Sequence, residues 1–225
     1  MIIDDATRWD IIHKKSHKET DTHSKYAEEK EVLFPRKSLV VELGAGRGTD
    51  AMYFLGKGHS LIALDISAFA LKILQERAKK MNLEKKLVAR QIDFGLQLIP
   101  VKDSSVDVVY SRISINYFGS KQTTKLFKDI YRILKPGGLA FISLKSPDDT
   151  LEMQYLERSS TLYEPNVFIE GGLLRSRFTK DQLKIMLKAA EIPEFSVESY
   201  QEDLSTKGGD HNKVLFVSEV SFKKV

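Results

Sequence analysis

A short apolar run followed by three glycines constrains the fold of this chain more than any other feature. The run Leu39–Leu43 is rich in β-branched residues and carries a single charge, Glu42, which is typical of a buried strand in a parallel sheet. Three glycines follow at alternate positions, Gly44, Gly46 and Gly48, and residues 49–55 are then predicted to form a helix. Strand, glycine turn and helix form the opening of a nucleotide-binding βαβ unit, where glycines let the backbone turn sharply against a ligand.

The spacing of the glycines separates two classes of nucleotide. The dinucleotide fingerprint has its third glycine three positions after the second, so that pyrophosphate sits on the helix N-terminus. In this chain that position is Thr49, and the third glycine comes one residue earlier. Glu42, two residues before the first glycine, is expected to face the ligand from the end of the strand. A carboxylate there repels a diphosphate and suits a cation, which argues against NAD and for a ligand with an amino acid end.

The stretch from Glu42 to Gly48, Glu-Leu-Gly-Ala-Gly-Arg-Gly, resembles the first motif of the class I S-adenosylmethionine (SAM) dependent methyltransferases. The resemblance covers Leu39 to Leu144 and includes Asp65, Asp93 and the run Leu-Lys-Pro-Gly-Gly at 134–138, in the order of the family. It implies an α/β fold, a seven-stranded Rossmann-like sandwich whose mostly parallel sheet has an antiparallel C-terminal strand. It also implies SAM as the cofactor and S-adenosylhomocysteine as the product. The segment Phe178-Thr-x-x-x-Leu resembles the small-molecule branch, which includes tellurite- and thiopurine-type enzymes.

The resemblance assigns cofactor roles to residues that follow successive strands. It implies that the glycine loop wraps the methionine moiety, that Asp65 holds the ribose hydroxyls, and that Asp93 meets the adenine. Asp65 follows the first glycine by about 20 residues, the spacing of a ribose-binding acid, although it could instead cap the helix that Ser67 begins. A turn role competes for Asp93. The expected cofactor contacts are Glu42, Gly44, Ala45, Gly46, Gly48, Asp65, Ile66, Asp93, Phe94, Ser111 and Arg112.

The end of the fourth predicted strand, residues 106–111, is expected to face the transferred methyl group. Methyltransferases that act on the amino group of adenine or glutamine carry N/D-P-P-Y/F there, whereas this chain has Ser111-Arg-Ile-Ser, which argues against that reaction. Methyl transfer from a sulfonium depends chiefly on alignment, and a base is needed only where the acceptor must lose a proton. The candidates for that base are Asn116, Tyr117 and His211.

We expect one domain, 1–225, in four parts. They are an N-terminal helical lid (1–36), a SAM-binding core (37–145), an acceptor-covering insertion (146–178), and a C-terminal helix and hairpin (179–225). In the lid, Trp9 and Tyr26 are candidates for contacts near the ligands, with core packing as the favoured alternative. The insertion is expected to be a long loop. Its arginines, Arg158, Arg175 and Arg177, could bind an anionic acceptor or be surface charges.

Composition limits the chemistry and the compartment. The 225 residues include no cysteine, which excludes disulfides, thiolate metal sites and a cysteine nucleophile. His13 and His17 have the spacing of two metal ligands, but spacing supplies no third, so we expect no metal. Without an apolar span or a signal peptide, a cytoplasmic protein that does not enter membranes is expected. The net charge of +4, from 35 basic and 31 acidic residues, argues against nucleic acid as a partner.

Methyl transfer from SAM to a small-molecule acceptor is therefore the predicted function. An RNA or protein methyltransferase is one alternative, and it predicts a basic stripe. A SAM-binding regulatory subunit without turnover is another, which the intact glycine loop does not exclude. A dehydrogenase fits least, because position 49 is not glycine. The sequence does not identify the acceptor or its reacting atom, and it leaves a homodimer open.

Overall fold

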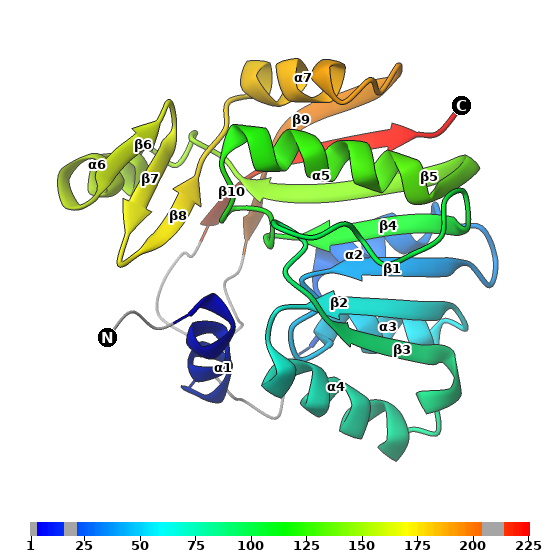
Figure 1. Ribbon diagram of the computed structural model, residues 1–225. Helices are drawn as coiled ribbons and strands as arrows, with labels where there is room; N and C mark the ends of the chain where they lie inside the picture. The colour runs from blue at the N-terminus through cyan, green and yellow to red at the C-terminus, as the bar shows by residue number, and fades with distance from the viewer. Residues whose placement is uncertain (1–3, 16–21, 204–213) are drawn as a thin grey trace.

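The protein is described by a computed structural model that covers residues 4–15, 22–203 and 214–225. Its frame is a seven-stranded sheet in the order β3-β2-β1-β4-β5-β10-β9 (Figure 1). The strands are β1 (Leu39–Leu43), β2 (Ser60–Asp65), β3 (Leu87–Gln91), β4 (Val106–Arg112), β5 (Leu134–Lys145), β9 (Phe195–Asp203) and β10 (Val214–Lys223). The first five strands are parallel to one another, and β10 is antiparallel to both of its neighbours. The predicted fold class is confirmed.

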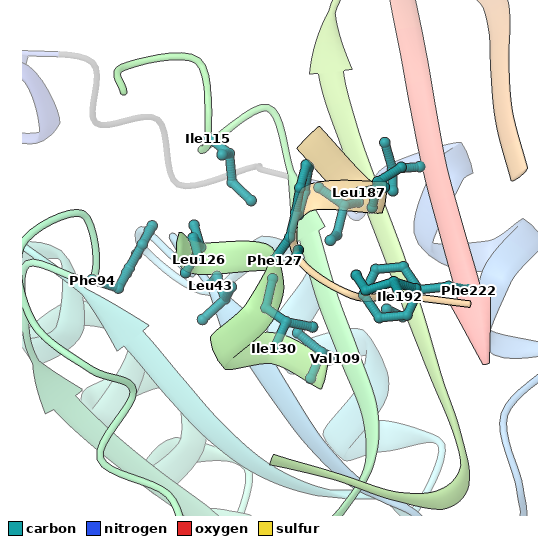
Figure 2. Packing of buried hydrophobic residues seen from close by; sticks show 14 of the residues in the cluster. Leu43, Phe94, Val109, Ile115, Leu126, Phe127, Ile130, Leu187, Ile192 and Phe222 are labelled. Carbon is teal, nitrogen blue, oxygen red and sulfur yellow. The ribbon is translucent and has the colours of Figure 1, made fainter. Parts of the chain in front are cut away.

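Helices cover both faces of this sheet. They are α2 (Lys25–Glu31), α3 (Thr49–Gly56) and α4 (Ala68–Lys80) on one face, and α5 (Ser120–Ile133) and α7 (Lys180–Ala189) on the other. Alternation along β1 divides its side chains between the faces: Val40 packs with the first group, and Leu43 with the second. Figure 2 shows the second core, where Phe127 and Ile130 of α5 lie near Leu187 of α7. Because both faces are covered, the central parallel strands β1, β2 and β4 are largely apolar in the sequence.

The order of the strands places a crevice between β1 and β4. The chain passes from β1 outward to β2 and β3, and then returns to the opposite side of β1 with β4 and β5. Ligands of open α/β sheets bind where the strand order reverses, at the carboxyl ends of the strands. The helix α1 (Asp5–Lys15) stands apart from the two helical layers, beside this edge of the sheet (Figure 1).

The predicted loop after β5 is wrong, because the segment has regular structure. It contains the helix α6 (Thr150–Ser159) and a separate antiparallel sheet of β6 (Thr161–Glu164), β7 (Val167–Glu170) and β8 (Leu173–Ser176). The hairpin turns contain residues with positive φ, Asn166 at 63° and the pair Gly171 and Gly172 at 55° and 81°. Strands of four residues are too short to show an alternating pattern, and this is why the sequence predicts a loop.

Two details of the large sheet depend on pairing between distant residues. The run at 135–138 belongs to β5, because Leu134 pairs with Val106 and a register shift follows before Val108. In the C-terminal hairpin, β10 lies inside the sheet between β5 and β9, and β9 is at the edge. Their predicted antiparallel pairing is confirmed.

Candidate active site

A pocket lies at the carboxyl ends of the parallel strands. It encloses about 750 Å³ of space that no protein atom occupies, a volume that includes the part open to solvent. The lining comes from α1, from the loops after β1 to β4, and from β8. The lining residues are Asp5, Trp9, His13, Gly44, Gly46, Asp65, Ile66, Ile92, Asp93, Phe94, Arg112, Ile113, Ser114, Tyr117, Phe118 and Leu173.

The glycine loop needs glycine for both its conformation and its packing. Gly44 has a φ of 72°, and a Cβ built on it would lie 2.2 Å from Cβ of Ser114. Gly48 has a φ of 78°, and its Cβ would lie 2.2 Å from Leu74 of α4. Gly44 and Gly46 line the pocket, whereas Ala45 and Gly48 are buried beside it. The loop therefore presents bare backbone to the pocket on one side and packs against the protein on the other.

Asp65 joins the glycine loop to the start of α4. Its Oδ2 accepts a hydrogen bond from the Gly46 amide (2.7 Å), and its Oδ1 accepts one from the Ser67 amide (2.8 Å). Burial raises the pKa of Asp65, although these hydrogen bonds oppose the shift. Ser67 caps α4 by accepting from the Ala70 amide, so the cap does not depend on Asp65 alone. Each carboxylate oxygen keeps a second lone pair for a ligand in the pocket.

The residues after β3 and β4 take several roles. Asp93 lines the pocket and also accepts from the Gly95 amide (2.9 Å), so the competing turn role is present as well. The ring of Phe94 meets that of Phe118 edge to face, with centroids 5.6 Å apart. Arg112 lines the pocket and donates to both carboxylate oxygens of Glu202 on β9.

Ser111, expected at the cofactor, is fully buried and donates to the Leu43 carbonyl. It lies outside the pocket lining that the described residues form. Its hydroxyl instead ties the end of β4 to the end of β1.

Glu42 does not reach the pocket surface in the described structure, contrary to the expectation that it faces the ligand. Its side chain is 5% exposed, and its Oε2 has no hydrogen-bond partner among the described residues. Burial raises the pKa of Glu42 well above its usual range, and the nearby carboxylates of Asp50 and Asp65 raise it further. Asp50 has its own donors, the Ser24 amide, the Ser24 hydroxyl and the Tyr110 hydroxyl. Glu42 is therefore a buried acid whose described surroundings disfavour its charged form.

The three candidates for a base have different positions. Tyr117 lines the pocket, with the Trp9 ring at 4.8 Å and the Arg175 guanidinium 5.2 Å from its centroid. Burial raises the pKa of Tyr117 more than the neighbouring arginines lower it, so the phenol stays protonated and is poorly suited to act as a base. Asn116 is 1% exposed, and its Oδ1 accepts from the Lys145 amide. It joins the segment after β4 to the end of β5, and it is not among the lining residues of the pocket. His211 lies outside the described residues.

The N-terminal segment divides between the pocket and the core. Asp5, Trp9 and His13 recur at every fourth position of α1 and face the pocket together. Burial lowers the pKa of His13. Tyr26 of α2 is instead a core residue, 2% exposed. The spacing of Asp5, Trp9 and His13 indicates this pocket-facing stripe in the sequence, although only Trp9 was predicted to lie near the ligands.

The insertion contributes Leu173 to the pocket wall and holds two of its three arginines in ion pairs. Arg177 is buried against Glu152, Arg175 pairs with Glu170, and Arg158 is exposed. Within the described ranges, no helix is long and apolar enough to cross a membrane. The same ranges contain no group of three or more His, Cys, Asp or Glu that could hold a metal ion. His17, of the predicted histidine pair, lies outside them.

Comparison with known proteins agrees with this architecture. Residues 40–138 match the family model described as a methyltransferase domain. The chain is 33% identical over 120 residues to a malonyl-[acyl-carrier protein] O-methyltransferase of Xylella fastidiosa, covering 53% of this chain and 38% of the relative. It is 31% identical to an arsenite methyltransferase of Halobacterium salinarum, covering 75% of this chain and 40% of that protein. The chain thus spans about two fifths of the length of either relative.

Among solved structures, a SAM-dependent methyltransferase of Methanosarcina mazei superposes with a TM-score of 0.69 at 18% identity. The superposition covers 87% of this chain and 96% of that one. At this identity the likeness shows a shared fold. At 87% of this chain, the match extends beyond residues 40–138 of the methyltransferase domain model.

Proposed function

Because the chain contains a class I SAM-dependent methyltransferase domain, we propose that it transfers a methyl group from SAM to a small-molecule acceptor by in-line displacement. One observation carries the proposal. The carboxylate of Asp65 is hydrogen-bonded to the backbone of the glycine loop on one side and to the start of α4 on the other, at the wall of the pocket. This arrangement holds an acceptor of hydroxyl hydrogen bonds beside bare backbone, as the ribose and methionine parts of SAM require.

The residues present fit SAM. The Oε2 of Glu42, two residues before Gly44, has no hydrogen-bond partner among the described residues and would accept a hydrogen bond from the ammonium group of the methionine end, a contact that favours the ionised form of this acid. Asp65 retains lone pairs for the two ribose hydroxyls. Ile66, Ile92 and Phe94 supply apolar walls for the adenine, and Asp93 supplies an acceptor for its amino group.

When bound, SAM supplies a methyl group that its positive sulfur already activates. The chain has to bind the two reactants, orient them and exclude water, which is catalysis by proximity. Trp9, Tyr117 and Leu173 line the far side of the pocket and would position the acceptor. The protonated Tyr117 would orient the acceptor by hydrogen bonding and would not abstract a proton. Acceptors that are already nucleophilic therefore suit this pocket.

A small acceptor fits a pocket that α1 lines with Asp5, Trp9 and His13 and that is only partly open to solvent. The RNA and protein alternatives need a broad basic surface, and the charges of this chain are nearly balanced. A non-catalytic SAM-binding subunit remains the rival from another class. The screen for acceptors would begin with a malonyl thioester and arsenite, the groups named for the two relatives.

The cofactor assignment is tested by calorimetric titration with SAM, S-adenosylhomocysteine and NAD. We expect the two sulfur ligands to bind and NAD not to bind. Asp65→Ala should weaken binding by roughly 1–3 kcal/mol, the cost of losing hydrogen bonds to a charged group. Turnover of labelled SAM with any acceptor would then exclude the non-catalytic alternative. If wild-type protein binds neither sulfur ligand, the proposal is wrong.

We also propose that the chain acts as one cytoplasmic domain, in which 1–36 and 146–178 close the site around the core at 37–145, with 179–225 completing the fold. The sequence also leaves open whether the chain forms a homodimer. Light scattering after size exclusion distinguishes a monomer of 25.6 kDa from a dimer.

A further inference from the structure

The helix α1 crosses the pocket without a core of its own. None of its residues 5–15, all of which the structure describes, is buried. Its pocket-facing stripe of Asp5, Trp9 and His13 contributes three lining residues. A helix with so little buried surface needs specific polar contacts to stay in place. Where these contacts lie determines which part of the pocket depends on the position of α1.

Asp10 makes such a contact on the cofactor side. Its Oδ1 accepts from the Ser67 hydroxyl (2.6 Å) and from the Phe69 amide (3.1 Å). Both donors belong to the first turn of α4, whose free amides and positive dipole end favour a carboxylate. On the acceptor side, Arg8 donates to the Gly171 carbonyl in the turn between β7 and β8.

A chain of hydrogen bonds leads from Asp10 into the cofactor site. Ser67, which donates its hydroxyl to Asp10, is fully buried and donates its amide to Asp65. Asp65 in turn accepts from the amide of Gly46 in the glycine loop. On α1 itself, His13 follows Asp10 by less than one turn, and its Cε1 would lie 3.3 Å from a Cβ on Gly46. Asp10 therefore connects α1 to the glycine loop by two routes, through Ser67 and Asp65 and through the helix itself.

We propose that Asp10 is a positioning residue for the cofactor: it latches α1 over the glycine loop and fixes Ser67 and Asp65 for the ribose. The inference rests on the proposed function, since it assumes that SAM occupies this pocket. Asp10 itself is placed outside the pocket lining of the described structure and acts through its neighbours. A ligand that binds only when α1 is in place has an apparent affinity reduced by the fraction of molecules in which α1 is displaced.

The test compares Asp10→Ala with Asp10→Asn in calorimetric titrations with S-adenosylhomocysteine and SAM. An asparagine keeps an oxygen that accepts from Ser67 and Phe69, whereas alanine removes it. We expect Asp10→Ala to bind roughly 10-fold more weakly and Asp10→Asn to stay within about 3-fold of wild type, because two hydrogen bonds to a carboxylate are lost only in the former. Glu76→Ala is the matched control, since Glu76 is an exposed acid of α4 whose pair with Lys72 lies away from Ser67.

The single tryptophan of the chain supplies a readout that needs no ligand. Trp9 lies on α1 with its ring centroid 4.8 Å from that of Tyr117. In Asp10→Ala we expect red-shifted emission and stronger quenching by acrylamide than in wild type, Asp10→Asn or Glu76→Ala. Saturating S-adenosylhomocysteine should restore the wild-type emission. Far-ultraviolet circular dichroism of each variant checks that the fold is intact.

Three results would overturn the inference. One is unchanged Trp9 quenching in Asp10→Ala, which would mean that α1 does not depend on the latch. Another is wild-type affinity in the same variant. The third is an equal loss in Asp10→Asn, which would indicate charge in place of hydrogen bonding. Failure of the wild type to bind either sulfur ligand would instead refute the proposed function, and Trp9 quenching would still test the latch.

Discussion

At the scale of single residues, the most informative side chain is a carboxyl group without a partner. Glu42 is buried next to two other acids, and its Oε2 accepts no hydrogen bond from the described residues. A buried group of this kind lowers stability unless a ligand compensates it. The unpaired carboxyl group of Glu42 therefore lowers the stability of the ligand-free protein, and binding of a cation beside it would remove this loss.

The cost of Glu42 predicts a pH dependence of stability. Because its pKa is raised in the folded protein, the folded state keeps a proton that the unfolded chain releases above the ordinary value of 4.5. The free energy of unfolding should therefore fall as the pH rises above 4.5, by up to about 1.4 kcal/mol per pH unit. Glu42→Gln should lack this decline, so urea unfolding from pH 5 to pH 8 should show a growing advantage of the variant. A constant difference between the two proteins would contradict the assignment.

A second prediction at this scale concerns the glycine loop. Gly44→Ala should abolish detectable SAM binding and lower stability by roughly 1–3 kcal/mol, the cost of a strained φ with a close contact. Gly56→Ala is the matched control, since a Cβ there meets nothing within 4 Å and its φ is not positive. The control should bind SAM as the wild type does and gain about 0.5–1 kcal/mol from helix propensity. Equal behaviour of the two variants in calorimetry and urea unfolding would refute the role of Gly44.

At the scale of elements, an ion-pair cluster helps to attach the insertion to the core. Glu152 of α6 receives two hydrogen bonds from the Arg177 guanidinium, and Lys145 at the end of β5 contacts the same carboxylate. Burial alone would raise the pKa of Glu152, but these two cations outweigh it and lower the pKa to about 2. A charge-assisted bidentate pair of this kind gives orientation as well as energy. The cluster thus fixes α6 and, through it, the sheet that supplies Leu173.

The cluster predicts a stability contribution with the opposite pH dependence. Glu152→Gln should lower the free energy of unfolding by about 1–2 kcal/mol at neutral pH, after allowance for partial exposure. Because the folded-state pKa is depressed, this contribution is present above the ordinary value of 4.5 and is lost as the pH falls toward about 2. Chemical unfolding of both proteins across this range measures the loss. Glu157→Gln, an exposed position of the same helix, should change stability little at any pH.

At the scale of the whole molecule, the cofactor site joins segments from most of the chain. A ligand bound there should stabilise the folded state by about 2.7 kcal/mol at 100 times its dissociation constant. For a chain of this size we expect S-adenosylhomocysteine to raise the melting temperature by roughly 5–10 °C. Differential scanning fluorimetry measures the shift, with NAD as the ligand that should leave it unchanged. An equal shift with NAD would point to a dinucleotide site.

The sequence predicts the elements whose signals are local and misses those that depend on distant contacts. The strands β1, β2 and β4 are apparent because strands covered on both faces are largely apolar. Asp65 and Asp93 are apparent because each lies at or just after the end of a predicted strand. The hairpins of the insertion lack this signal. The contact of Asp10 is also not apparent in the sequence, since its partner Ser67 lies 57 residues later in the chain. The structural role of Asn116 depends in the same way on pairing with β5.

The position of β10 has a consequence for the time course of folding. β10 follows β9 in the chain but lies between β5 and β9, so β9 has no neighbour in the sheet until β10 arrives. During synthesis the four strands around the glycine loop can pair first, since all of them precede β5 and lie side by side. Arg112, however, finds its carboxylate partner Glu202 on β9. The nascent chain can therefore form β1 to β4 and the glycine loop early. The charge of Arg112 at the pocket is balanced by Glu202 only after β10 has inserted between β5 and β9.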